Sequence, residues 1–342
     1  MAARTNRQIH LVKRPETIPT EEHFKFVEVP VPSLGENEVL IHNLYLSVDP
    51  YMRGRMSDAK SYVAPFNLNE KLVGGVVGEV VESASSRFSK GDIVTGMLGW
   101  EEYSKASENE IRKIDPKMAP VTTALGILGL TGLTAYFGIE DICRPKEGET
   151  VVVSGAAGAV GSTAGQIAKI FGARVVGIAG SDDKVDYIQN ELGFDAAINY
   201  KTTDDIQAAL EEACPNGVDA YFDNVGGEIS DAVLNLLNKH ARIAQCGAIS
   251  SYNKANDQGP RIQTKLIKSS ALIKGFVVSD YSDRFKEGAS NLGKWLSEGK
   301  LTYEETIVEG FENIPEAFLG LFKGTNRGKQ LVKIGEPEVG EI

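Results

Sequence analysis

The amino-acid sequence predicts an α/β protein in which a doubly wound parallel sheet is joined to a second, β-rich domain. A buried strand, a glycine turn and the start of a helix follow one another in residues 149–169. Short apolar runs then alternate with helical segments up to residue 278, which is typical of a parallel sheet covered on both faces. The first third of the chain instead contains strand-like segments separated by Gly, Pro and Asn.

The strand and glycine turn have the sequence ETVVVSGAAGAVGSTAGQIAK. Gly155, Gly158 and Gly161 punctuate the turn, and Ala156 stands where the most familiar fingerprint has its first glycine. A dinucleotide requires a tight turn, a backbone that approaches the pyrophosphate, and a helix N-terminus that faces the anion. An ordinary strand-to-helix turn is the alternative, but the position between a strand and a helix favours dinucleotide binding.

The alternation after this turn predicts five further strands, at residues 174–180, 196–200, 218–225, 241–247 and 271–278. Helices are expected between them, over residues 183–193, 204–214 and 228–237. In the first third, the strand-like segments are residues 38–46, 71–81 and 92–98. Similar strand-like segments occur again at residues 301–309 and 329–334. We therefore expect a β-rich domain at residues 1–125 that residues 305–342 complete, and a Rossmann dinucleotide-binding domain at residues 126–304.

Composition and charge limit the possible partners. The formal net charge of −11 argues against nucleic acid. Residues 119–139 are uncharged and long enough to span a bilayer, but four glycines, a proline and four threonines favour buried helices beside the cofactor. The basic start of the chain lacks the apolar run of a signal peptide. Since the three cysteines form no disulfide framework or metal cluster, we expect a cytoplasmic protein with no membrane partner.

The end of the second predicted strand, Gly180-Ser181, bears on the choice of nicotinamide cofactor. NAD enzymes usually carry Asp or Glu at this position, where it bonds the ribose hydroxyls. Asp182 and Asp183 come later, where they suggest the cap and first turn of the next helix. Lys184 is then placed to face an adenosine 2′-phosphate, with Ser181 as a hydrogen-bond donor, although a solvated surface lysine is the alternative. The pattern favours NADP(H) over NAD.

Nine stretches along nearly the whole chain resemble, in the same order, one zinc-independent family of medium-chain dehydrogenases/reductases. This is the leukotriene 12-hydroxydehydrogenase/15-oxoprostaglandin 13-reductase family, which includes alkenal double-bond reductases and curcumin reductases. The stretches are SVDPYMRGRM (47–56), GLTGLTAYFGI (129–139), SGAAGAVGS (154–162), GIAGSDDK (177–184), INYK (198–201), YFDNVGG (221–227), CGAISSYN (246–253), GFVV (275–278) and NRGKQLVKI (326–334). The resemblance implies that the β-rich part is a GroES-like catalytic domain.

Zinc-dependent relatives take ligands from an early Cys, a Gly-His-Glu motif and a lobe of four cysteines. Here SVDPYMRG lacks the Cys, residues 74–79 lack the His, and the chain has no cysteine lobe. Surface or packing roles suit the four histidines better, namely His10, His23, His42 and His240. We therefore expect no bound metal.

The resemblance implies reduction of a carbon–carbon double bond conjugated to a carbonyl, with hydride from NADPH added to the β-carbon. A hydrogen-bond donor must then stabilise the enolate oxygen, and a proton must reach the α-carbon. The family pattern places Tyr252 beside the nicotinamide, while the cofactor ribose hydroxyl is the other candidate donor. A structural tyrosine at a loop hinge is the alternative. The competing functions are an NADPH quinone reductase and a non-catalytic nucleotide-binding protein.

The resemblance also implies a set of cofactor contacts along the chain. They are Pro50, Thr131, Gly158, Ala159, Val160, Gly161, Gly180, Ser181, Lys184, Tyr200, Asn224, Cys246, Gly247, Ala248, Ile249, Ser250, Tyr252, Phe276, Val277, Val278 and Asn326. An enone or enal substrate would meet Tyr51, Tyr62 and Tyr252, although Tyr51 and Tyr62 suit a core equally well. Cys246 is expected to be a packing residue, because no His is placed to activate it. The family implies a homodimer, joined edge to edge near residues 271–278.

Overall fold

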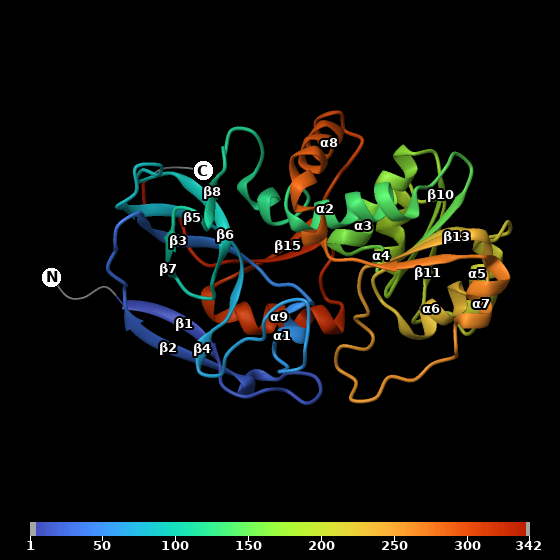
Figure 1. The fold of residues 1–342 in the computed structure, drawn as a ribbon, viewed down its shortest axis with the longest axis horizontal. Coiled ribbons are helices and arrows are strands. Elements are labelled where there is room, and N and C mark those ends of the chain that lie inside the picture. The colour runs from blue at the N-terminus through green and yellow to red at the C-terminus, as the bar shows by residue number, and fades with distance from the viewer. Residues whose placement is uncertain (1–4, 340–342) are drawn as a thin grey trace. The chain divides into compact units, whose positions relative to one another are not determined.

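The computed structural model describes residues 5–339, and it divides into two compact units (Figure 1). Unit 1 contains the described residues of Met1–Leu125, Thr306–Asn326 and Gln330–Ile342. Unit 2 contains Gly126–Glu305 and Arg327–Lys329. The short segment Arg327–Lys329 therefore belongs to unit 2, although it lies within the range that the sequence assigned to the β-rich domain.

Unit 2 is built on a six-stranded parallel sheet with the strand order β11-β10-β9-β12-β13-β14. Its strands are β9 (Thr150–Ser154), β10 (Arg174–Ala179), β11 (Ala196–Asn199), β12 (Val218–Asp223), β13 (Leu237–Gln245) and β14 (Leu272–Gly275). Its helices are α2 (Leu130–Phe137), α3 (Ala159–Ile170), α4 (Asp182–Asp186), α5 (Ile206–Ala213), α6 (Gly227–Val233), α7 (Gln263–Ser269) and α8 (Phe285–Ser297). The strand order reverses direction between β9 and β12, which creates a topological switch point.

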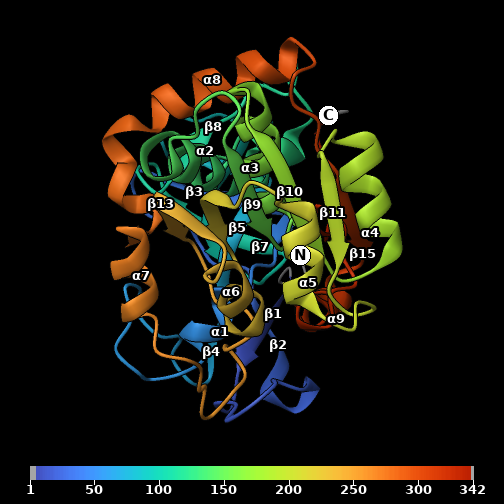
Figure 2. The same cartoon turned by 90° about the vertical axis from the view of Figure 1, so that its right-hand side faces the viewer.

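Helices cover both faces of this sheet, as Figure 2 shows. Val151 and Val153 of β9 belong to one core cluster, together with apolar residues of α2, α3 and α8. Val152, between them, belongs to a second cluster with residues of α5 and α6. Because side chains alternate along a strand, the apolar run of β9 fills both cores at once. The predicted doubly wound sheet is therefore confirmed.

Several predicted elements of unit 2 end earlier than the sequence suggests. The sixth strand stops at Gly275, because the Phe276 ring turns into the core and Val278 begins the 3₁₀ segment η5 (Val278–Arg284). The helix predicted at 228–237 ends at Val233, and residues from Leu237 already belong to β13. The helix predicted at 183–193 is α4 followed by the π-helical turn η4 (Tyr187–Glu191).

Unit 1 is β-rich and contains two sheets. The larger has the strand order β15-β16-β3-β5-β6-β8, with β7 also paired to β3, and the smaller has the order β2-β1-β4. The strands are β1 (Thr5–Leu11), β2 (Phe24–Pro30), β3 (Glu38–Ser47), β4 (Glu70–Lys71), β5 (Val73–Ser83), β6 (Ile93–Gly99), β7 (Tyr103–Ser107), β8 (Ile111–Lys113), β15 (Glu305–Glu309) and β16 (Lys329–Lys333). Antiparallel pairing of β16 with β3 brings the late segment into the same sheet as the first third.

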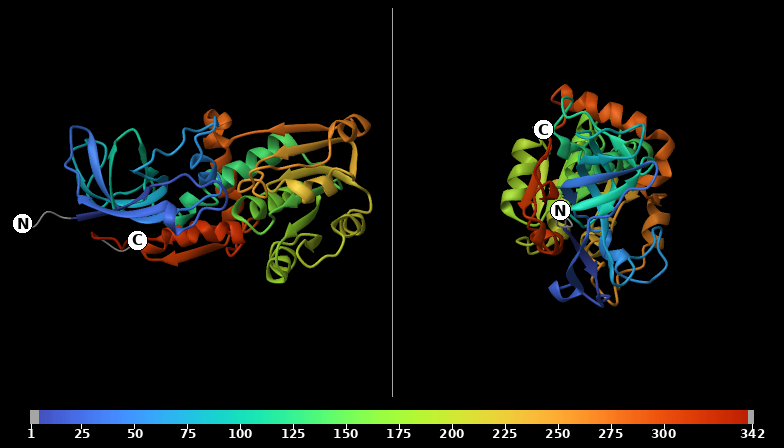
Figure 3. Two further views of the ribbon diagram at one scale, coloured as in Figure 1. Left: turned by 90° about the horizontal axis from the view of Figure 1, so that it is seen from below. Right: turned by 90° about the vertical axis from the view of Figure 1, so that its left-hand side faces the viewer.

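The core of unit 1 is aromatic at its centre. Trp100 stacks on Phe24 with 6.1 Å between ring centroids, and Phe318 of α9 (Ile314–Lys323) meets both rings edge-on. Figure 3 shows α9 next to the N-terminal strands. Short helices complete the unit, namely α1 (Met52–Arg55) and the 3₁₀ segments η1 (Glu21–His23), η2 (Val121–Leu125) and η6 (Phe311–Asn313). The C-terminal helix is therefore held by residues from the first hundred.

The uncharged stretch at residues 119–139 forms short, largely buried helices, as predicted. It is divided among η2, α2 and the start of the π-helical turn η3 (Gly138–Cys143). Across residues 5–339, no helix has both the length and the hydropathy that a bilayer crossing requires.

Candidate active site

The glycines of the turn after β9 differ in how much space surrounds them. Gly155 has φ +60°, and a Cβ on Gly161 would lie 2.3 Å from the Gly155 carbonyl oxygen, so α3 packs closely against the turn. A Cβ on Gly158 would instead meet only the Gly155 oxygen, at 3.4 Å, which is an ordinary contact. The protein itself therefore leaves open space at Gly158, directly before the N-terminus of α3. A bound pyrophosphate would use that space and the amides of Ala159 and Val160.

A segment distant in the sequence covers one side of this turn. Gly328 forms an isolated parallel bridge with Gly158, and its amide donates to the carbonyl oxygen of Ala157 at 2.8 Å. This segment directly follows Asn326, which the resemblance assigns as a late cofactor contact. The short piece Arg327–Lys329 is thus attached to unit 2 by the backbone of the glycine turn itself.

Asn224 lies at the switch point, next to the same turn. Its Nδ2 donates to the carbonyl oxygen of Ser154 at 2.8 Å, and its amide donates to the Ser154 hydroxyl at 3.0 Å. Ser154 ends β9 and Asn224 follows β12, so the two central strands are joined where their carboxyl ends diverge. Ligands of open α/β sheets bind at this place. The structure therefore brings Asn224 and the glycine turn together.

The loop that carries Tyr252 is attached to the residues around Asn224. The amide of Ile249 donates to the Asn224 carbonyl oxygen at 3.3 Å. The Ser250 hydroxyl donates to the Val225 carbonyl oxygen at 2.6 Å. The half-buried Tyr252 hydroxyl accepts a hydrogen bond from the Ala248 amide at 3.2 Å. That bond uses an oxygen lone pair, so the phenolic hydrogen can still be donated to a ligand. Burial raises the pKa of the Tyr252 phenol, which keeps it protonated at neutral pH.

The predicted phosphate-binding residues meet after β10 and β11. Asp182 and Asp183 are exposed in the first turn of α4, as predicted, but the N-cap is Ser181 rather than one of the two acids. The Ser181 side chain bonds Asp183 and lowers the pKa of that carboxyl, so it already has a partner within the protein. A Cβ on Gly180 would lie 3.0 Å from the Tyr200 ring. Gly180 and Tyr200 are thus adjacent, at the same end of the sheet as Lys184.

Lys201 also lies in this group, although it was not among the predicted cofactor contacts. The Cε of Lys201 would lie 3.3 Å from a Cβ on Gly180. Burial lowers the pKa of Lys184, the Asp183 charge raises it, and the positive charge of Lys201 lowers it further. Two ammonium groups therefore gather beside Gly180. The only signal in the sequence is that Lys201 follows Tyr200 at the end of a strand.

Three further residues of unit 2 that were predicted to contact the cofactor also interact with other residues of the protein. The Phe276 ring is 8% exposed and packs edge-on against Phe222, so the fold uses this side chain in the core. The Thr131 hydroxyl donates to the Gly126 carbonyl oxygen at 2.8 Å. Val277 caps η5, and its amide donates to the carboxylate of Asp280 at 3.3 Å.

Cys246 is placed as a packing residue. Its amide donates to the Asp223 carbonyl oxygen at 2.9 Å, and that of Gly247 donates to the same oxygen at 3.0 Å. Burial raises the pKa of the Cys246 thiol to about 12, so the thiolate needed for nucleophilic attack is scarce at neutral pH.

Four of the predicted residues belong to unit 1. Pro50 directly precedes Tyr51, which is the N-cap of α1 and packs against the unit 1 core. Burial raises the pKa of the Tyr51 phenol. Tyr62 is 67% exposed, so it is not the core residue that the sequence left open as an alternative. Asn326 is the last residue of unit 1 before the chain enters Arg327–Lys329.

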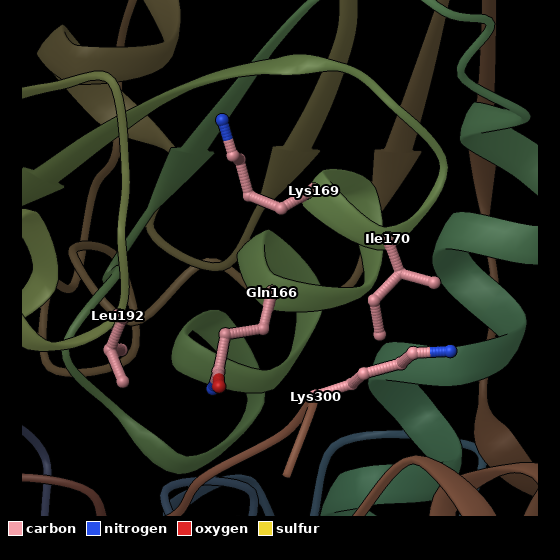
Figure 4. A pocket seen from close by; sticks show the side chains of 5 residues that line it. All are labelled: Gln166, Lys169, Ile170, Leu192 and Lys300. Atoms are coloured by element: carbon pink, nitrogen blue, oxygen red, sulfur yellow. The ribbon is translucent and has the colours of Figure 1, made fainter. Parts of the chain in front are cut away.

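A surface groove on unit 2 contains none of the predicted site residues. It is lined by Gln166, Lys169, Ile170, Leu192 and Lys300. Figure 4 shows the ammonium groups of the two lysines pointing in different directions, and each is paired, Lys169 with Asp195 and Lys300 with Glu298. A second, narrow pocket lies beside the first turn of α3 and is lined in part by Ala159. Within residues 5–339, no three His, Cys, Asp or Glu side chains are arranged to hold a metal ion.

Two family models match the chain. Residues 7–114 match the N-terminal domain of oxidoreductase, and residues 159–294 match the zinc-binding dehydrogenase model. A Bacillus subtilis protein assigned as an NADP-dependent oxidoreductase, YfmJ, is 66% identical over 97% of this chain and 99% of its own length. The NADPH-dependent curcumin reductase of Escherichia coli is 43% identical over 96% of this chain and 97% of its own length.

Solved structures agree with these matches. The crystal structure of CurA from Vibrio vulnificus in complex with NADPH has a TM-score of 0.92 and 43% sequence identity, and it covers 97% of this chain and all of its own. The predicted two-domain fold and the predicted cofactor, NADP(H), are thereby confirmed. The prediction that the protein is an enzyme is also confirmed. The chain belongs to the medium-chain dehydrogenase/reductase superfamily, and within it to the family of NADP-dependent oxidoreductases that includes the curcumin, prostaglandin and 2-alkenal reductases.

Proposed function

We propose that the protein reduces the carbon–carbon double bond of α,β-unsaturated ketones and aldehydes, with NADPH as the reductant and without a metal ion. The observation that carries this proposal is the placement of Tyr252, a protonated phenol attached to the Asn224 turn at the switch point. The names of relatives support it, among them the 2-alkenal reductase of Nicotiana tabacum, 43% identical over 96% of this chain.

The residues of unit 2 fit the cofactor. The open backbone at Gly158 would hold the pyrophosphate, and Lys184, Tyr200 and Lys201 would hold the adenosine 2′-phosphate. Asn224 and the loop 246–252 would hold the nicotinamide end. When bound, NADPH supplies the hydride for the β-carbon of the substrate. Pro50 and Asn326 remain proposed contacts from the resemblance.

Tyr252 would act on the substrate carbonyl. The hydroxyl of Tyr252 would donate to the carbonyl oxygen and stabilise the negative charge that develops there. The Tyr252 oxygen accepts a hydrogen bond from the Ala248 amide, and this bond fixes the orientation of the phenol. Tyr51 and Tyr62 are proposed as substrate contacts.

Turnover by the wild-type protein tests this function against its rivals. We expect NADPH to be consumed with an α,β-unsaturated ketone and a saturated ketone to form, equally fast after dialysis against a chelator. Consumption of NADPH with quinones while enones stay intact would instead indicate a quinone reductase. Tight NADPH binding without turnover across a broad enone panel would indicate a nucleotide-binding protein.

Tyr252→Phe is expected to lower kcat about tenfold, because one donor to the enolate oxygen is removed while the cofactor ribose hydroxyl remains. In the wild type, burial raises the pKa of Tyr252, so the donor should stay protonated and kcat should not fall through its ionisation as the pH rises above neutral. Steady-state rates across pH measure both effects. An unchanged kcat in Tyr252→Phe would favour the ribose hydroxyl as the donor.

We further propose a cytoplasmic homodimer that is joined through β14, the terminal strand of the unit 2 sheet. Leu272 in this strand is 55% exposed, and Ile267 in the preceding α7 is 77% exposed. Pairing of two such edges would extend the sheet and cover both side chains.

Light scattering after gel filtration tests the dimer. We expect a dimer for the wild type, a monomer for Leu272→Lys, and a dimer for the control Met118→Lys, which alters an 83% exposed side chain of unit 1. A monomeric wild type would contradict the proposal.

A further inference from the structure

Asp223, the last residue of β12, has a fully buried carboxylate with an unusual number of neutral donors. Its Oδ1 accepts from the Ser154 hydroxyl at 3.0 Å, the Tyr221 hydroxyl at 2.9 Å, and the amides of Val225 and Gly226, both at 2.9 Å. Its Oδ2 accepts from the Ser230 hydroxyl and from Gln245 Nε2, the latter at 3.1 Å. A buried carboxylate is costly unless hydrogen bonds satisfy its lone pairs, and here they do.

Three of these donors, Val225, Gly226 and Gln245, lie next to the two segments that form the proposed nicotinamide end of the site. Val225 and Gly226 belong to the turn that directly follows Asn224, where Gly226 has φ +70°. Gln245 ends β13, and its Nε2 also donates to the Gly247 carbonyl oxygen at 2.7 Å. The amide of Gly247 in turn donates to the Asp223 carbonyl oxygen at 3.0 Å. Asp223 therefore accepts hydrogen bonds from both the Asn224 turn and the start of the Tyr252 loop.

We propose that Asp223 is a positioning residue, whose carboxylate sets the place of Asn224 and Tyr252 relative to the nicotinamide end of the cofactor. This inference rests on the proposed function and extends it to a residue that touches neither cofactor nor substrate. An apolar side chain at this position would leave the amides of Val225 and Gly226 without this acceptor, so the buried carboxylate is required by the turn that it holds.

The hydrogen-bond donors around Asp223 require a carboxylate at this position rather than an amide. In Asp223→Asn, one amide oxygen would have to replace an Oδ1 that accepts from four donors. The new NH₂ group would face the NH₂ of Gln245. If Gln245 turned its oxygen toward Asn, that oxygen would also face the Gly247 carbonyl oxygen, which now accepts a hydrogen bond from Gln245. The Tyr252 loop would have to move in either case.

Binding of two ligands to Asp223→Asn tests the proposal. NADPH reaches both ends of the site, whereas adenosine 2′,5′-bisphosphate reaches only the end at Gly180 and Lys184. We expect NADPH affinity and kcat with an enone to fall about tenfold or more, while the affinity for adenosine 2′,5′-bisphosphate stays within about twofold of the wild type. In the control Tyr221→Phe, which removes one donor to the same carboxylate but no bond to either loop, all three quantities should stay within about twofold.

Two outcomes would overturn the proposal. Equal losses of affinity for both ligands would show a general structural role, and unchanged NADPH affinity and kcat would show that the carboxylate does not position the loops. If Asp223→Asn does not fold, Gln245→Leu removes the link between Asp223 and Gly247 and should give the same separation of the two affinities. The binding comparison does not need turnover, so it stays decisive even if the wild type fails to reduce enones.

Discussion

Gly158→Ala is expected to weaken NADPH binding roughly 100-fold while the protein still folds, because the new methyl group would occupy the space proposed for the pyrophosphate. Gly158 has φ −83°, which alanine adopts readily, and the added Cβ meets only the Gly155 oxygen at 3.4 Å. The free energy of unfolding should therefore change by at most about 1 kcal/mol, the usual cost of alanine at an N-cap. Fluorescence titration with NADPH and thermal unfolding measure the two quantities.

Two neighbouring substitutions provide the contrast. Gly161→Ala would place its Cβ 2.3 Å from the Gly155 carbonyl oxygen, so it should destabilise the fold itself by about 1–3 kcal/mol. Gly293→Ala in α8 adds the same methyl group where nothing lies within 4 Å, and it should leave NADPH affinity unchanged. Wild-type NADPH affinity in Gly158→Ala would mean that the pyrophosphate does not approach this backbone.

Lys184→Ala is expected to weaken NADPH binding roughly 10- to 100-fold and to leave NADH binding nearly unchanged. A charge-assisted hydrogen bond to phosphate contributes about 2 kcal/mol, and NADH lacks the phosphate. Burial and the positive charge of Lys201 both disfavour the protonated form of Lys184, so a bound dianion would relieve the cost of charging it. Measuring KM for both cofactors tests the selectivity.

Lys169→Ala is the matched control for the loss of one lysine charge from unit 2. Lys169 pairs with Asp195 at 2.9 Å on the last turns of α3, and it is not among the proposed contacts. Its removal should not change the ratio of the two KM values. If Lys184→Ala affects NADPH and NADH equally, Lys184 has no role in phosphate recognition, and the surface-lysine alternative holds.

Local patterns made the fold class predictable. The apolar run Val151–Val153, with small residues and glycines after it, predicts both the central strand and the turn, because short-range sterics determine where a chain can turn and where a helix can approach. The first turn of α4 at Asp182 and Asp183 was also predictable, since a helix start depends on adjacent residues, although the N-cap is Ser181 and not one of the two acids. The end of β14 was not, because Phe276 leaves the strand to pack against Phe222, more than fifty residues earlier.

The polar contacts of the site depend on distant residues. Asn224 bonds Ser154 across seventy positions, and the carboxylate of Asp223 joins donors from β9, β12, α6 and β13. Lys201 and Lys184 approach each other because β10 and β11 are parallel neighbours. Sequence periodicity does not predict such pairs, because strand order and loop geometry determine the hydrogen-bond partners.

The sequence by itself determined the doubly wound sheet, the glycine turn and the NADP(H) cofactor, since each of these follows from residues close together in the chain or from their resemblance to a known family. Only the tertiary structure decided which groups surround Tyr252, that Gly158 leaves space where Gly161 has none, and that Asp223 connects two loops. The physical reason is that turns and helix starts depend on local sterics. A buried hydrogen-bond network exists only after distant strands have paired and excluded water.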